Sequence, residues 1–158
     1  MKRPAVVFLV GLLLLPCCTL PIYNGGIEPI YPGVKTVGKQ YETVDSLTPT
    51  FRWKSEATPS CTYDFGIWDV GESLPSGISG TMVMRGTALY YKEALAQPEH
   101  KVEIALGPDT LYFWSVRTRC NNKVSNWATF DYQAWLVVAS SSGSNWPFSF
   151  KTPKVETK

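Results

Sequence analysis

Short runs of alternating apolar and polar residues occupy much of the chain after Thr43, and they constrain its fold more than any other feature. In the clearest run, residues 112–120 (YFWSVRTRC), Tyr, Trp, Val, Thr and Cys stand at the even positions, while Ser115, Arg117 and Arg119 stand at odd positions. Successive side chains of a strand point to opposite faces, so this pattern predicts a half-buried strand whose even-numbered residues face inward.

Three further runs alternate in the same way, at Thr50–Trp53, Cys61–Ile67 and Lys101–Leu106. We expect the last of these to bury Val102, Ile104 and Leu106. Helical periodicity is weak everywhere except around Tyr90–Leu95, and Pro, Gly and Ser break the runs. These features predict an all-β fold.

The composition suits one domain with a core of its own. The chain has 158 residues, of which 44% are hydrophobic, 13% aromatic and 18% charged. We place the domain at residues 43–153 and a polar tail at residues 154–158. There are 15 Lys and Arg residues against 13 Asp and Glu, and removal of a leader containing Lys2 and Arg3 makes these counts equal. We therefore expect no nucleic-acid partner.

A positively charged start and a short apolar segment open the chain. Lys2 and Arg3 precede the eleven-residue apolar run Ala5–Leu15. A membrane-spanning helix needs about 20 apolar residues. The run therefore predicts an export signal rather than an uncleaved anchor.

Leu15-Pro16-Cys17-Cys18 resembles the cleavage motif of bacterial lipoprotein signals, in which an apolar residue stands three places before the modified cysteine. The resemblance implies that residues 1–17 are removed and that Cys18 receives acyl chains. Several acyl chains anchor a protein durably in a membrane. Thr19 after the cysteine implies the outer membrane of a bacterial envelope. An ordinary secretory peptide, from which both cysteines are lost, is the alternative.

Residues 18–42 are interpreted as the lipidated terminus and a Pro/Gly-rich tether. A flexible chain of the length of residues 21–40 spans roughly 25 Å, which would let the domain stand clear of the lipid headgroups. The alternative is that part of this segment lies along the domain as an edge strand. That alternative rests on Ile22, Ile27, Ile30 and Tyr31.

Three motifs resemble the fibronectin type III and immunoglobulin-like sandwiches, especially those of bacterial surfaces. SLTPTFRW (residues 46–53) places Trp on a second strand after a proline turn, and LGPDTLYFWSVR (106–117) looks like the tyrosine corner that opens the sixth strand. SNWPFSFKTP (144–153) is similar to the last strand. The resemblance implies a single antiparallel β-sandwich.

The chain departs from that family at residues 121–145, which stand before the last strand. Two closings of the sandwich are open, because the triplet Ser-Asn-Trp occurs at residues 125–127 and again at 144–146. The segment Trp135–Ala139 is apolar and β-prone, so we expect an extra strand or hairpin in this insertion.

In such a sandwich the third and sixth strands are antiparallel neighbours, which bears on two of the four cysteines. Cys61 opens the third strand and Cys120 closes the sixth, both on the inward face, so we predict a disulfide between them. Two buried free thiols are the alternative. We expect no metal site, because these cysteines and the distant His100 do not have the spacing of zinc ligands.

Few residues suggest catalysis. His100 is the only histidine and precedes a strand, where we expect it to be solvated. Asp69 and Glu72 lie in a Gly-rich turn and are interpreted as surface charges rather than as a glycosidase pair. The sequence has no phosphate-binding loop, calcium loop or dinucleotide fingerprint. We therefore expect no enzyme and no cofactor apart from the lipid on Cys18.

Tryptophan favours a binding function. Trp127, Trp135 and Trp146 lie in or beside the insertion, and exposed Trp on a loop is a strong interface anchor. The alternative is that these rings pack as a second small core over the end of the sandwich. The outward sheet face is a second candidate surface, although we expect it to be solvated. Its residues are Asp64, Trp68, Arg117 and Arg119.

Our leading hypothesis is a non-catalytic, lipid-anchored envelope protein that binds another envelope component through its aromatic insertion. A glycan-binding module is the alternative, and it predicts coplanar, solvent-facing Trp rings flanked by Asn, Gln or Asp. An enzyme comes third and requires a polar cleft around His100 or the Asp69–Glu72 turn.

Overall fold

The computed structural model describes residues 21–34, 41–58, 60–70, 87–121, 123–132 and 146–155. This part of the chain is all-β, with eleven strands and no helix. The strands are β1 (Pro21–Asn24), β2 (Ile27–Tyr31), β3 (Glu42–Thr43), β4 (Thr50–Ser55), β5 (Thr62–Asp69), β6 (Tyr90–Leu95), β7 (Glu99–Lys101), β8 (Leu111–Cys120), β9 (Lys123–Val124), β10 (Thr129–Tyr132) and β11 (Phe148–Lys151).

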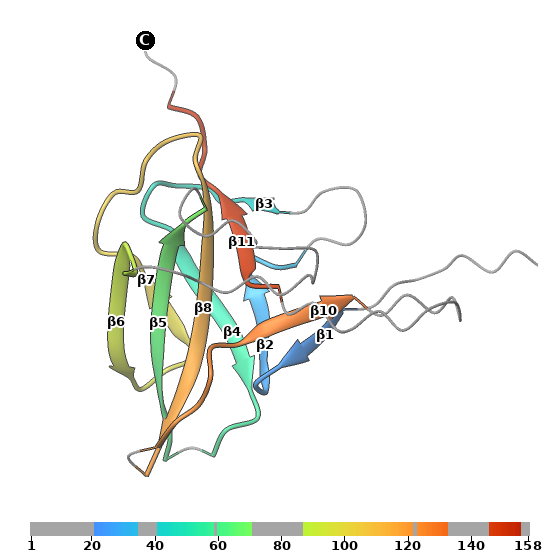
Figure 1. Cartoon of the computed structure of the whole chain (residues 1–158). Helices are drawn as coiled ribbons and strands as arrows, with labels where there is room; N and C mark the ends of the chain where they lie inside the picture. Colours follow the sequence, from blue (N-terminus) through green and yellow to red (C-terminus); the bar gives the residue numbers. More distant parts are fainter. Residues whose placement is uncertain are drawn as a thin grey trace, which may run out of the picture.

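Two sheets pack face to face as a β-sandwich (Figure 1). One has the strand order β2-β4-β7, and the other has the order β3-β11-β8-β5-β6, with β9 also paired to β8. All pairs are antiparallel except the short pair of β3 with β11. β1 and β10 form a separate two-stranded ribbon.

Aromatic rings fill the space between the two sheets. Phe51 of β4 lies 4.8 Å from Phe65, 4.9 Å from Trp114 and 5.0 Å from Phe150, measured between ring centroids. These three partners stand on β5, β8 and β11, so one ring joins both sheets. Such tilted and edge-on contacts are the favoured geometries of aromatic pairs. The alternating runs thus bury their apolar face as predicted.

One buried position was predicted wrongly. Val102 and Leu106 are buried, but Ile104 is 44% exposed. The pairing of β7 with β4 ends at Lys101, and the chain bends after it, so the strand alternation does not continue to residue 106.

Residues 21–31 form strands, which corrects the tether prediction for this segment. β2 pairs with β4, and Ile27 is only 1% exposed in the core. Pro29 fits because β2 is an edge strand, where a missing backbone N–H costs no sheet hydrogen bond. The folded domain therefore begins well before residue 43, as in the edge-strand alternative.

The last strand of the larger sheet is divided into two parts by the insertion. β11 pairs with the first half of β8, while β9 and residues 125–128 run along its second half, with the N–H of Ala128 donating to the oxygen of Val116 at 2.9 Å. Phe130 and Trp146 then exchange two backbone hydrogen bonds of 2.8 Å, which close the base of the excursion. Both possible closings are therefore used. The segment Trp135–Ala139 lies outside the described residues.

A disulfide joins Cys61 to Cys120, as predicted. The S–S distance is 2.04 Å and the two Cα atoms are 4.6 Å apart. β5 and β8 are antiparallel neighbours with Thr62 opposite Arg119, so the two cysteines meet at the end of this pair. The bond joins neighbouring strands of one sheet.

Candidate interaction face on the larger sheet

Strand β5 turns Asp64, Gly66 and Trp68 to the outer side of the larger sheet, because Tyr63, Phe65 and Ile67 fill the core. We name this outer surface the Asp64 face. It consists of Asp64, Trp68, Tyr91, Arg117, Arg119 and Trp127.

We expected a solvated face here, and the structure corrects this expectation. The Asp64 side chain has 0% exposure, and Trp68 is buried as well. A buried carboxylate is stable only where donors replace its hydration shell.

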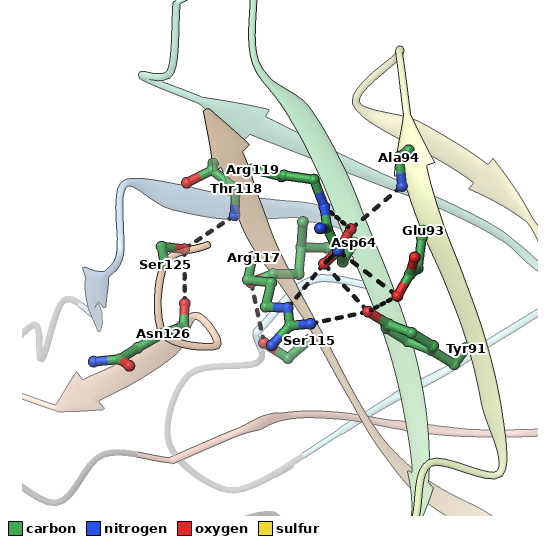
Figure 2. Close-up of polar contacts among 11 residues, drawn as sticks. Asp64, Tyr91, Glu93, Ala94, Ser115, Arg117, Thr118, Arg119, Ser125 and Asn126 are labelled. Carbon is green, nitrogen blue, oxygen red and sulfur yellow. Dashed lines mark hydrogen bonds and ion pairs between the residues drawn. The ribbon is translucent and has the colours of Figure 1, made fainter. Parts of the chain in front are cut away.

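Two arginines of β8 supply most of these donors (Figure 2). Arg117 donates from Nε to Oδ2 of Asp64 at 3.0 Å. Arg119 donates from Nη2 to Oδ2 at 2.8 Å and from Nε to Oδ1 at 3.2 Å. Arg117 stands directly opposite Asp64 in the β5–β8 register, and Arg119 reaches it diagonally. Their side chains are 26% and 33% exposed, so each arginine also faces solvent.

Strand β6 supplies the remaining donors to Asp64. The Tyr91 hydroxyl lies 3.2 Å from Oδ2 and shares its single proton between Asp64 and Glu93, and the Ala94 N–H donates to Oδ1 at 3.3 Å. Ala94 has a φ of 56°, in the left-handed region that a residue with a side chain rarely adopts. This conformation accompanies a register shift between β5 and β6 that directs the N–H toward the carboxylate.

These donors keep Asp64 ionised. Burial raises the pKa of its carboxyl, but the hydrogen bonds from Arg119, Ala94 and Arg117 outweigh burial, and the pKa lies below its usual value. The pKa of Tyr91 is raised, first by burial and then by the hydrogen bond from its hydroxyl to Glu93. At neutral pH the face therefore contains a buried, ionised carboxylate and exposes parts of two guanidinium groups and a neutral phenol.

Aromatic rings cover the other side of Arg117. The centre of its guanidinium lies 4.6 Å from the Trp127 ring centroid, which is a cation–π contact. Trp127 also meets Trp68 edge-on at 4.9 Å between ring centroids. The Trp68 ring in turn lies over Gly66, where an added Cβ would stand 2.5 Å from a ring carbon. Glycine at position 66 is therefore required by this close approach.

The structure brings together two of the three predicted tryptophans. Trp127 and Trp146 both pack, partly buried, against the cluster of Trp68 and Phe113. These contacts agree with the alternative prediction, in which the tryptophan rings pack as a second small core. Trp135 lies outside the described residues, as does Cys18.

Tyr91 of this face, and Glu93 and Ala94 that contact it, were not predicted from the sequence. The sequence around them shows apolar residues at the spacing of a helix, whereas the structure has the strand β6. The adjacent pair Tyr90-Tyr91 could have indicated that one tyrosine faces the core and the other the outer surface, since successive strand residues face opposite sides. Tyr90 is buried and Tyr91 is exposed.

His100, Asp69 and Glu72, the residues weighed for catalysis, lie away from the Asp64 face or outside the described residues. We expected His100 to be solvated, but it is buried in β7. Its Nε2 lies 2.8 Å from the Tyr90 hydroxyl. Burial lowers the pKa of His100. Asp69 ends β5 at an exposed position, and Glu72 lies outside the described residues.

The described residues include no cluster of three His, Cys, Asp or Glu side chains placed to hold a metal. They also include no helix long and apolar enough to cross a membrane. A shallow polar hollow of about 540 Å³ is lined by residues of the smaller sheet and its loops, among them Tyr31, Asp45, Arg52 and Lys101, and it is separate from the Asp64 face.

No family model, curated protein or solved structure matches this chain.

Proposed function

We propose that the protein is a non-catalytic, lipid-anchored envelope protein whose Asp64 face binds another envelope protein. The observation that carries the proposal is the arrangement of Arg117, Tyr91 and Trp127, held in place by the buried Asp64 carboxylate. Arg, Tyr and Trp are the residue types that contribute most to protein interfaces. Because these side chains are already ordered, binding a partner costs them little conformational entropy.

The first segment of the sequence supports the proposed location. Leu15-Pro16-Cys17-Cys18 supports acylation of Cys18 after removal of residues 1–17, and Thr19 supports the outer membrane. An intact mass of membrane-extracted protein tests this part. We expect an added mass of lipid size and the absence of Met1 to Cys17.

We further propose that the domain belongs to the fibronectin type III and immunoglobulin-like class of sandwiches. The strand order supports this assignment. A three-stranded sheet faces a larger sheet in which β11, β8, β5 and β6 follow one another as neighbours. The hydroxyl of Tyr112, two residues into β8, accepts a hydrogen bond from the Gly107 N–H at 3.0 Å, as in a tyrosine corner.

A protein partner is favoured over a glycan by the surroundings of Trp127. A sugar stacks on an open aromatic face, whereas Arg117 covers one face of this ring and Trp68 meets it edge-on. Asp64 is saturated with donors and held ionised, which suits a structural carboxylate better than a proton-transferring one. We therefore place glycan binding second and catalysis third.

The test is a cross-linked pull-down of the tagged, membrane-anchored protein from gently solubilised envelopes. Trp127→Ala and Trp135→Ala are compared with the natural chain, and Ile104→Ala serves as the matched control because Ile104 is exposed outside the Asp64 face. Unfolding curves verify that each variant is folded.

We expect one partner to be recovered in stoichiometric amount by the natural chain and by Ile104→Ala, and to be lost with Trp127→Ala. A partner retained by folded Trp127→Ala but lost with Trp135→Ala would move the interface from the Asp64 face to the part of the insertion around Trp135. Background recovery by every folded bait would overturn the protein-partner proposal and direct the search to glycan arrays.

A further inference from the structure

The β1–β10 ribbon is joined firmly to the sandwich. Phe130 of β10 is buried and stacks on Phe148 of β11 with 6.0 Å between ring centroids. Tyr23 of β1 meets the same Phe148 ring edge-on at 6.4 Å. The backbone hydrogen bonds between Phe130 and Trp146 fix the base of the ribbon to the start of the last strand. The ribbon is therefore packed as part of the domain.

Little chain separates this ribbon from the proposed acylation site. β1 begins at Pro21, three residues after Cys18, and Pro21 is paired with Tyr132 of β10. A fully extended chain covers at most about 3.6 Å per residue, so the Cα atoms of Cys18 and Pro21 are at most about 11 Å apart. The tether of roughly 25 Å that the sequence suggested is thus much shortened.

Strand β6 lies on the opposite side of the domain from the ribbon (Figure 1). In the larger sheet the order β11-β8-β5-β6 places β6 three interstrand steps from β11, which is about 14 Å. The ribbon adjoins the β11 side through Trp146 and Phe148. Among the described strands of the larger sheet, β6 is therefore the one farthest from a membrane surface at the ribbon.

We propose that the β1–β10 ribbon rests on the lipid bilayer and holds the sandwich close to the membrane, with its β6 edge pointing away. The surface that the ribbon contacts is the layer of lipid headgroups. The inference rests on the proposed acylation of Cys18. In this orientation the Asp64 face stands beside the membrane rather than against it, where a second envelope protein can reach it.

The test measures the proximity of two labelled positions to lipid. Asp131→Cys in β10 and Leu89→Cys next to β6 are each labelled with a fluorophore in the acylated protein and reconstituted into phosphatidylethanolamine and phosphatidylglycerol vesicles. Headgroup spin-labelled lipid quenches fluorophores only at short range. The control variant carries a long Gly-Ser linker between Leu20 and Pro21, which frees the domain from the anchor. Intact mass verifies acylation in every sample.

We expect the fluorophore at position 131 to lose most of its emission and the one at position 89 to lose little, with the contrast reduced by the linker. Equal quenching at both positions in a protein of the acylated mass would overturn this orientation and leave the lipid-anchor proposal intact. A protein without the lipid mass would overturn both.

Discussion

Asp64 organises the outer face of the larger sheet, because a fully buried carboxylate needs donors on each side. Arg117, Arg119, Tyr91 and the Ala94 N–H are all placed by this requirement. The arginines remain partly exposed, so the same groups that neutralise Asp64 are available to a partner.

Asp64→Asn is expected to destabilise the protein by about 1–3 kcal/mol, because the amide NH₂ would face guanidinium donors and lose their hydrogen bonds. Each arginine is partly exposed and can form hydrogen bonds with water instead, which keeps the loss of folding free energy within this range. Urea unfolding at neutral pH measures the effect. Glu99→Gln is the matched control, since the Arg52–Glu99 ion pair is 58% and 52% exposed and contributes about 0–1 kcal/mol. Equal losses in the two variants would contradict a special role for Asp64.

His100 is expected to make stability depend on pH. Its pKa in the folded protein is lowered, first by burial, so below about pH 6.5 the unfolded chain binds a proton more readily than the folded one. Stability contributed by neutral His100 is therefore complete above that pH and falls as the pH decreases, by at most about 1.4 kcal/mol per pH unit.

His100→Gln removes the titrating group while keeping a polar partner for Tyr90. The free energy of unfolding, measured from pH 8 to pH 5, should fall less steeply in this variant than in the natural chain. Parallel curves would show that His100 does not contribute to the slope.

At the scale of elements, the sequence was informative wherever strands alternate regularly. The inward residues of β8 and the pairing of Cys61 with Cys120 were predicted, because both depend on a period of two and on the neighbourhood of β5 and β8. β6 escaped recognition because the register shift near Ala94 interrupts that period. The burial of Asp64 was missed because it depends on groups from two other strands, β6 and β8, that are distant from β5 in the sequence.

The Trp68 ring lies so close over position 66 of β5 that only glycine fits there. This contact predicts that the effects of substitutions at positions 66 and 68 on stability are coupled. Gly66→Ala should displace the ring and destabilise the protein by about 1–3 kcal/mol, as overpacking does. In a Trp68→Ala background the same substitution should cost much less. Unfolding free energies of the two single variants and the double variant measure this coupling. Additive losses would contradict the close approach.

At the scale of the whole molecule, the sandwich was predictable and its N-terminal limit was not. Alternation and turn residues indicated an all-β domain without reference to distant contacts. The pairing of Pro21 with Tyr132 joins two segments far apart in the sequence that no local pattern relates. The division of the last strand likewise depends on Phe130 meeting Trp146 across the insertion.

Truncation tests where the domain begins. A chain that starts at Val34 lacks β1 and β2, and thereby loses Ile27 from the core and the edge partner of β4. Burial of one such side chain contributes about 1.5–3 kcal/mol, and the pairing of β2 with β4 is lost with it. We therefore expect this variant to lose a large part of the roughly 5–15 kcal/mol that stabilises a small domain. A chain that starts at Gly26 keeps β2 but loses β1, with its pairing to β10 and the contact of Tyr23 with Phe148, so it should fold with reduced stability.

Near-UV circular dichroism and urea unfolding compare both truncated chains with a reference that starts at Pro21. A flexible tether at residues 21–40 would predict identical curves for all three chains. The graded loss expected here follows instead from the two strands lying on the sandwich, one in its core-bearing sheet and one in the ribbon. The same strands that close the fold would then set how near the domain stands to its anchor.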